Sequence, residues 1–146
     1  MQTDHYIFPK EGSKTGLKTP PHHLRHAFKF KDYCPRIFHR IRVLSGVDTQ
    51  SYMASVCGES NYRKFTSNSK SGQFFFFTHD GQFMVKTIAH SESKELQRSL
   101  RAYFEYIRKN PDSFIIRVFG FHRVKVPCVA CFSTLVSLCP FVPVSL

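Results

Sequence analysis

The chain has 146 residues, enough for one domain of ordinary size. Hydrophobic residues make up 42% of it and aromatic residues 15%, which excludes a wholly disordered chain. Its formal net charge of +11 favours a polyanionic partner, either nucleic acid or an acidic membrane face. No secretory signal opens the chain, and the five cysteines form no evenly spread framework, so we expect a reduced, cytoplasmic setting.

The composition divides the chain into three parts. Residues 1–23 mix glycine and proline with lysine, serine and threonine, which is typical of a flexible basic leader. Residues 24–126 carry the globular pattern. Residues 127–146 contain no charged side chain and form an apolar tail.

Two helices are predicted at the start of the globular part. The first begins at Asp32, which can cap it, and Gly46 is a plausible end. The second begins at Asp48 and ends at Gly58. Six apolar residues of these helices recur at helical spacing and are expected to face inward: Ile37, Ile41, Leu44, Tyr52, Met53 and Val56.

The period then changes to that of a sheet. Residues 72–78 and 81–88 flank a His79-Asp80-Gly81 turn, which predicts a β-hairpin. A stronger helix follows from Ser91 to the Asn110-Pro111 stop, with a regular apolar face: Leu96, Leu100, Phe104 and Ile107. Two further strands are expected: residues 114–119 and 121–126. The order predicts an α+β fold, a mostly antiparallel sheet with helices packed on it.

One stretch has the spacing of a phosphate-binding hairpin. A loop at residues 69–72 precedes a strand, a turn and a second strand that carries Lys86. Such a loop can offer backbone N–H groups to phosphates, while a strand lysine reaches the α- and β-phosphates and a helix carboxylate holds the lysine. Taken alone the pattern is weak, because a lysine on a strand usually faces solvent. It is not a Walker A loop, because no Gly-Lys-Ser/Thr follows at the right distance.

Four phrases of the sequence occur in an order that is specific. They are FKFKDYCPRIFHRIRVLSGVD (28–48), SYMASVCG (51–58), SKSGQFFFFTHDGQFMVKTI (69–88) and NPDSFIIRVFGFHRVKV (110–126). Together they resemble the start of the phosphatidylinositol phosphate kinase domain, whose members share phrases close to FKFKDYxPxxF, GKSGSxFF, FMIKT and FxGLHRVK. The resemblance covers roughly residues 27–126 and implies an incomplete amino-terminal lobe of that kinase fold.

The resemblance implies ATP and Mg²⁺ as cofactors of the intact family and assigns phosphate contacts to particular residues. Lys86 corresponds to the lysine on the ATP phosphates, and Glu92 is the best match for its carboxylate partner, with Glu95 as the alternative. Simple helix capping is an equal alternative for Glu92. The phosphate-covering loop corresponds to Ser69, Lys70, Ser71 and Gly72. Ser69 stands where the family has glycine and Gln73 where serine is common, which predicts a less pliable loop.

A basic stretch near the start of the lobe suggests a partner. Against the single carboxylate of Asp32 it carries six cations: Arg25, Lys29, Lys31, Arg36, Arg40 and Arg42. The resemblance implies that they face anionic phosphoinositides at the cytoplasmic side of the plasma membrane, while a solvated helix face is the alternative. A homo- or heterodimer with related kinases is a further expected association. Nucleic acid is not expected, because the chain has no groove-reading motif or zinc-finger spacing.

The catalytic aspartate, the metal-binding aspartate and the substrate-selecting loop of the family lie in a second lobe. Nothing in this sequence corresponds to them, so we expect no catalytic or metal-binding residue here and no kinase activity from the chain alone. A non-catalytic module that binds acidic membranes or dimerises with kinases is the alternative function. The resemblance does not reveal which phosphoinositide is preferred.

The tail after Val126 allows three interpretations. Cys128 and Cys131 have the spacing of a zinc or redox pair. The segment is long enough for a membrane helix but is interrupted by prolines. The favoured interpretation is a poorly structured end that does not belong to the family. The lobe would then lack its next strand, which leaves an unpaired sheet edge and predicts marginal stability.

Overall fold

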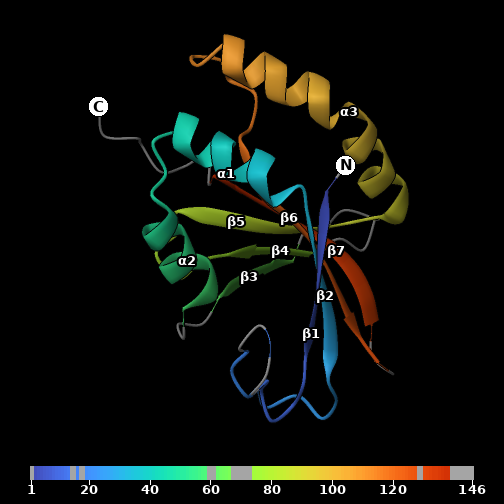
Figure 1. Ribbon diagram of the computed structural model, residues 1–146. Coiled ribbons are helices and arrows are strands. Elements are labelled where there is room, and N and C mark those ends of the chain that lie inside the picture. Colours follow the sequence, from blue (N-terminus) through green and yellow to red (C-terminus); the bar gives the residue numbers. More distant parts are fainter. Residues whose placement is uncertain are drawn as a thin grey trace.

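The computed structural model describes residues 2–13, 16, 19–58, 62–66, 74–127 and 130–138, with the backbone alone for residues 63–66 and 130–138. Within these residues, one antiparallel sheet has the strand order β1-β2-β6-β7-β5-β4-β3. The strands are β1 (Thr3–Phe8), β2 (Phe28–Tyr33), β3 (Arg63–Thr66), β4 (Phe74–Phe77), β5 (Phe83–Ile88), β6 (Val118–Val126) and β7 (Ala130–Leu138). The helices packed with it are α1 (Pro35–Leu44), α2 (Thr49–Cys57) and α3 (His90–Lys109) (Figure 1). The predicted α+β class is confirmed.

The first helix begins later than the sequence predicts. Asp32 lies in β2, whose residues from Phe28 to Lys31 alternate between aromatic and charged with the period of a strand. The backbone turns at Cys34, whose φ of 50° is left-handed and whose N–H donates to the carbonyl of Gln2 at 2.9 Å. α1 then starts at Pro35, because a proline ring already has helical φ and needs no hydrogen-bond donor there. The predicted cap at Asp32 is therefore wrong.

The helices bury the apolar faces that their spacing predicts, with two exceptions. Asp48 caps α2 by accepting a hydrogen bond from the Ser51 N–H at 2.9 Å, as expected. Leu44 and Met53 were expected inside but are 50% and 49% exposed. Leu44 is the last residue of α1, and Met53 lines an open pocket instead of packing beneath other side chains. The core consists chiefly of large apolar residues: Tyr33, Phe38, Ile41, Tyr52, Phe83, Leu100, Ile107, Phe119 and Phe121.

The predicted β-hairpin is confirmed as β4 and β5, joined by a tight turn. Asp80 organises this turn by accepting hydrogen bonds from the Thr78 hydroxyl at 2.6 Å and the Gln82 N–H at 3.1 Å. The Ser55 hydroxyl of α2 donates to the same carboxylate oxygen at 2.8 Å. Gly81 follows with a φ of 72°, a conformation that glycine adopts without strain.

The charge of Asp80 is expected to make stability depend on pH. Desolvation opposes the carboxylate, but the hydrogen bonds from Thr78, Gln82 and Ser55 outweigh it and lower the pKa of Asp80 below its ordinary value. A lowered folded-state pKa stabilises the protein above the unfolded pKa, about 3.9, and this gain is lost as pH falls through the folded pKa. Asp80→Asn should cost less than about 1 kcal/mol at pH 6, because the carboxylate is exposed, and less still at pH 3.

Urea unfolding at both pH values measures the effect of Asp80→Asn. Asp112→Asn, at an exposed aspartate outside the hairpin, is the matched control. An Asp80→Asn cost that is equal at the two pH values would contradict the assignment of the stabilisation to the charged carboxylate.

Residues 1–23, which were expected to be a flexible leader, contain the strand β1. β1 pairs with β2 from Thr3 opposite Tyr33 to Phe8 opposite Phe28, and the Phe8 and Phe28 rings stack 4.7 Å apart. The flexible-leader prediction is therefore wrong for residues 3–8. Its basis was local composition, whereas the partner of this strand lies some twenty residues further along the chain.

The two strands predicted after α3 are one strand. β6 starts only at Val118 and continues through Gly120, where its pairing with β7 shifts register. A glycine at such an irregularity bends a strand without ending it. The residues before Val118 lie outside any strand, and the side chain of Phe114 is fully exposed.

Residues 127–146, which were expected to be an unstructured tail, contain the strand β7, and the lobe was expected to lack this strand. β7 pairs with β6 on one side and with β5 on the other. A strand bonded to a neighbour on each side leaves no exposed backbone edge, so an uncharged sequence suits it as well as it suits a sticky unstructured end. The poorly structured tail and the unpaired edge beside β6 are therefore wrong predictions for residues 130–138. Cys128, one half of the proposed cysteine pair, lies outside the described residues.

Candidate functional site

Lys86 and Glu92 form an ion pair where β5 passes into α3. The Lys86 Nζ lies 3.8 Å from Glu92 Oε1, and the two side chains are 31% and 44% exposed. The pair forms because β5 ends at Ile88 and α3 begins at His90, which places Glu92 in the first turn of the helix. The sequence prediction that these two residues meet is correct in its geometry.

Glu92 also caps the helix, so the contact with Lys86 and the helix cap occur together. Its Oε2 accepts a hydrogen bond from the Ala89 N–H at 2.7 Å, while Oε1 faces Lys86. Ala89 has no side-chain acceptor, so only this half of a capping box forms. Glu95, the alternative partner, instead lies 3.5 Å from the guanidinium of Arg98.

The neighbours of Lys86 orient it on the β4–β5 hairpin. Its Nζ lies 5.7 Å from the ring centre of Phe75, the residue opposite it on β4. The Thr87 hydroxyl accepts a hydrogen bond from the Phe74 N–H at 2.8 Å, which extends the ladder to the first residue of β4. The arrangement holds the partly exposed Lys86 ammonium near the start of β4, where Phe75 lies opposite it.

The four residues of the predicted phosphate loop lie outside the described residues: Ser69, Lys70, Ser71 and Gly72. The chemistry that the structure does describe suits phosphate oxygens, because Lys86 is a cationic donor. The Glu92 carboxylate near Lys86 contacts the Lys86 ammonium and accepts a hydrogen bond from the Ala89 N–H. Within the described part of the chain, no group of three or more His, Cys, Asp or Glu residues could hold a metal ion.

The structure separates the six predicted membrane contacts. Arg25, Arg36 and Arg40 are exposed, in the loop before β2 and on α1. Arg42 points inward, where its Nη1 donates to the Phe119 carbonyl at 2.5 Å and its guanidinium lies 4.6 Å from the ring centre of Tyr52. Arg42 is thus not part of an exposed basic face.

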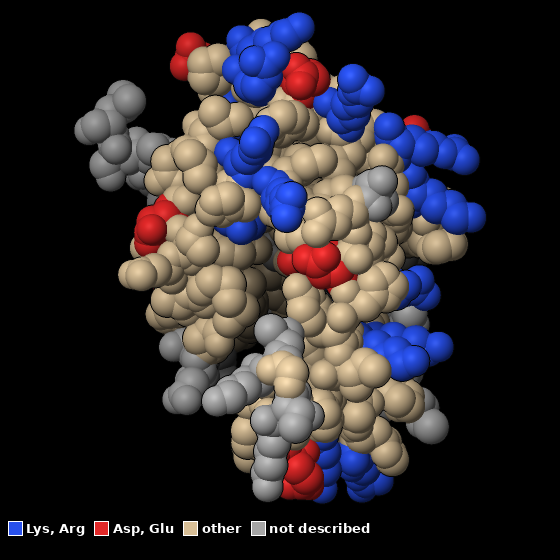
Figure 2. Space-filling view, in the orientation of Figure 1, with Lys and Arg blue, Asp and Glu red and all other residues tan. Residues whose placement is uncertain are grey.

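Lys29 and Lys31 belong to a larger basic group that local sequence patterns did not predict. On β2 they stand directly opposite Lys125 and Arg123 of β6. We call these four residues the basic block. The sequence HRVKV (122–126) does contain the pattern that could have predicted this group, because its cationic side chains recur with the period of a strand. Figure 2 shows lysine and arginine side chains along one edge and over the top of the molecule, with few acidic ones between them.

Among the helices that the structure describes, none is both long enough and apolar enough to span a membrane.

An antiparallel sheet whose strand lysine is paired with a carboxylate in the next helix is the plan of a kinase-type amino-terminal lobe. The model of the family described as Phosphatidylinositol-4-phosphate 5-Kinase matches residues 56–138, more than half of the chain. The chain belongs to this family. The match continues past Val126 to the end of β7, so the family resemblance does not stop where we expected.

Curated relatives agree with the family match. Phosphatidylinositol 4-phosphate 5-kinase 5 of Arabidopsis thaliana is 45% identical over 119 residues, which is 82% of this chain and 15% of the relative. A probable phosphatidylinositol phosphate kinase of Dictyostelium discoideum is 43% identical over 131 residues, which is 84% of this chain and 18% of the relative. The chain therefore spans less than a fifth of the length of these relatives.

Proposed function

We propose that this chain forms the part of a phosphatidylinositol 4-phosphate 5-kinase that contacts the phosphates of ATP. The observation that carries the proposal is the Lys86–Glu92 pair at the junction of β5 and α3. In the intact enzyme, ATP would be the phosphate donor, with Mg²⁺ held elsewhere, and phosphatidylinositol 4-phosphate would be converted to the 4,5-bisphosphate. The names of the relatives support this reaction.

The role of each residue follows from charge and position. Lys86 would donate to oxygens of the α- and β-phosphates, where a cation lowers the free energy of the anionic ligand. Glu92 keeps the Lys86 ammonium directed toward this position, and α3 keeps Glu92 in place through its bond to Ala89. These contacts position a nucleotide but do not activate a hydroxyl group, so the chain alone is proposed to be inactive.

The test is a chimeric kinase. The segment of this chain that aligns with Arabidopsis phosphatidylinositol 4-phosphate 5-kinase 5 replaces the corresponding 119 residues of that enzyme. Transfer of labelled phosphate from ATP to phosphatidylinositol 4-phosphate in vesicles is then measured. A folded chimera with activity close to that of the parent supports the proposal, and a folded chimera that binds lipid but transfers no phosphate contradicts it.

A second candidate function, association with an acidic membrane, is supported by the basic block. Lys29 and Lys125 are exposed, and like charges directly opposite each other on neighbouring strands are destabilising unless something neutralises them. An anionic phosphoinositide surface at the cytoplasmic face of the plasma membrane would do so. Each cation near such a surface contributes about 1 kcal/mol.

The double substitution Lys29→Glu, Lys31→Glu should weaken binding to vesicles that contain phosphatidylinositol 4,5-bisphosphate by roughly tenfold or more. Co-sedimentation with the vesicles measures this. The control, Lys94→Glu with Lys109→Glu, changes the net charge equally at two exposed positions of α3. Equal losses in both double variants would show attraction by net charge alone and contradict a specific role for the basic block.

A further inference from the structure

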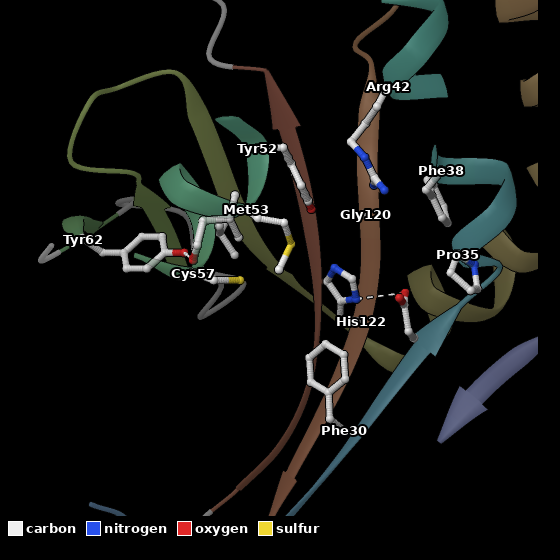
Figure 3. Close-up of a pocket in the computed structure, with 13 residues that line it drawn as sticks. Phe30, Pro35, Phe38, Arg42, Tyr52, Met53, Cys57, Tyr62, Gly120 and His122 are labelled. Atoms are coloured by element: carbon white, nitrogen blue, oxygen red, sulfur yellow. Dashed lines mark hydrogen bonds and ion pairs between the residues drawn. The ribbon is translucent and has the colours of Figure 1, made fainter. Parts of the chain in front are cut away.

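A pocket of about 370 Å³ opens between α1 and α2, over the face of the sheet that carries Gly120 and His122. Figure 3 shows Arg42 reaching into it from α1, Tyr52 and Met53 from the side of α2, and His122 from β6. Pockets for small molecules have volumes of about 300–1,000 Å³. This one is therefore large enough for a small ligand.

The pocket is separate from the proposed nucleotide site. Val85 lines it, whereas the next residue of β5 is Lys86. Successive side chains of a strand point to opposite faces of a sheet. A ligand in the pocket would thus lie on the other face of the sheet from the Lys86–Glu92 pair.

Two donors on residues that line the pocket have no protein partner in the described part of the chain. Arg42 Nε and the Tyr52 hydroxyl are buried, and neither has a hydrogen-bond partner among the described residues. The Arg42 guanidinium is held in place through Nη1, which donates to the Phe119 carbonyl. Burial raises the pKa of Tyr52 despite the opposing charge of Arg42, so its hydroxyl stays protonated and can donate. Buried donors of this kind are rare in folded proteins, and one explanation is that a ligand satisfies them.

Gly120 keeps the floor of the pocket open. A Cβ atom at this position would lie 2.6 Å from the Tyr52 hydroxyl and 2.6 Å from His122 Nε2, so the two polar atoms converge over the glycine. The other ring nitrogen of His122, Nδ1, lies 3.1 Å from Asp32 Oδ1, an ion-pair distance without good hydrogen-bond angles. Asp32 thus lies against His122, and Arg42 is the lining residue whose side chain always carries a positive charge.

The rest of the lining is mostly carbon. Apolar side chains from β2, α1, α2 and β5 surround the polar end: Phe30, Pro35, Phe38, Met53, Val56 and Val85. A ligand that fits this distribution has an apolar body and one anionic head that accepts hydrogen bonds. We propose that the pocket binds a small amphipathic carboxylate, with its head on Arg42 and Tyr52 and its hydrocarbon chain against the apolar walls.

Isothermal titration of the chain with decanoate, below the concentration at which it forms micelles, tests this site. Tyr52→Phe removes one hydroxyl and keeps the buried ring, and it should weaken decanoate binding roughly tenfold. Arg42→Met should weaken it further, because it removes the cation. The control is Tyr106→Phe, which removes an exposed hydroxyl of α3 and should leave the affinity unchanged.

Two further ligands test the two parts of the proposed chemistry. Decanol has the hydrocarbon chain without the charge, and acetate has the charge without the chain, so each should bind at least tenfold more weakly than decanoate. The proposal is overturned if decanoate does not bind, if decanol binds equally well, or if Tyr52→Phe and Tyr106→Phe bind decanoate alike. If Arg42→Met does not fold, Tyr52→Phe alone decides.

Discussion

Lys86→Met in the chimeric kinase is expected to lower phosphate transfer about 100-fold or more, since it removes the cation that we propose to contact the ATP phosphates. Methionine has a similar length and keeps the contact with Phe75, so the hairpin should remain folded. The measurement is the initial rate with ATP and phosphatidylinositol 4-phosphate. The control is Lys94→Met, at an exposed lysine of α3. Retained activity in Lys86→Met would contradict the assigned role.

Glu92→Gln separates the two roles of the carboxylate. Glutamine still has an oxygen to accept from the Ala89 N–H, so the helix cap and the stability should be kept. The ion pair with Lys86 is lost, so the rate should fall by about tenfold. Glu95→Gln, which breaks only an exposed pair with Arg98, should leave the rate unchanged. A fall in stability without a fall in rate for Glu92→Gln would show that capping is its only role.

Phe121→Ala is expected to cost about 3–5 kcal/mol of unfolding free energy, the largest effect on stability that we predict. The Phe121 side chain is fully buried, and its ring stacks 4.4 Å from that of Tyr33. Alanine would leave a cavity beside the Tyr33 ring in the buried core. Urea unfolding followed by circular dichroism measures the change, and loss of the folded signal in buffer would agree with the upper end of the range.

The matched control for Phe121 is Phe114, whose side chain is fully exposed in the segment before β6. Phe114→Ala should change stability by no more than about 0.5 kcal/mol. Similar costs for the two substitutions would mean that Phe121 is not part of a packed core.

The features that local sequence predicts well are those whose partners are near in the chain. Lys86 and Glu92 are six positions apart, with the end of one strand and the start of one helix between them. The β4–β5 turn and the apolar face of α3 are likewise local patterns of residue type and period. The short spacing between Lys86 and Glu92 allows the two side chains to meet, and the family resemblance singled out Glu92 as the partner of Lys86.

Other features depend on partners far along the chain. The pairing of β1 with β2 and the insertion of β7 between β5 and β6 are long-range, and composition alone made both segments resemble unstructured ends. The basic block likewise needs the register of β2 on β6.

The sequence by itself determined the family of this protein, because several family phrases occur in it in order, and that resemblance named Lys86 and Glu92 as a pair. Only the tertiary structure decided what Arg42 does. In the sequence it is one of six cations in a basic stretch. In the fold its guanidinium turns from the surface onto Tyr52 and Phe119, because α1 packs across β6 and brings residues 77 positions apart into contact.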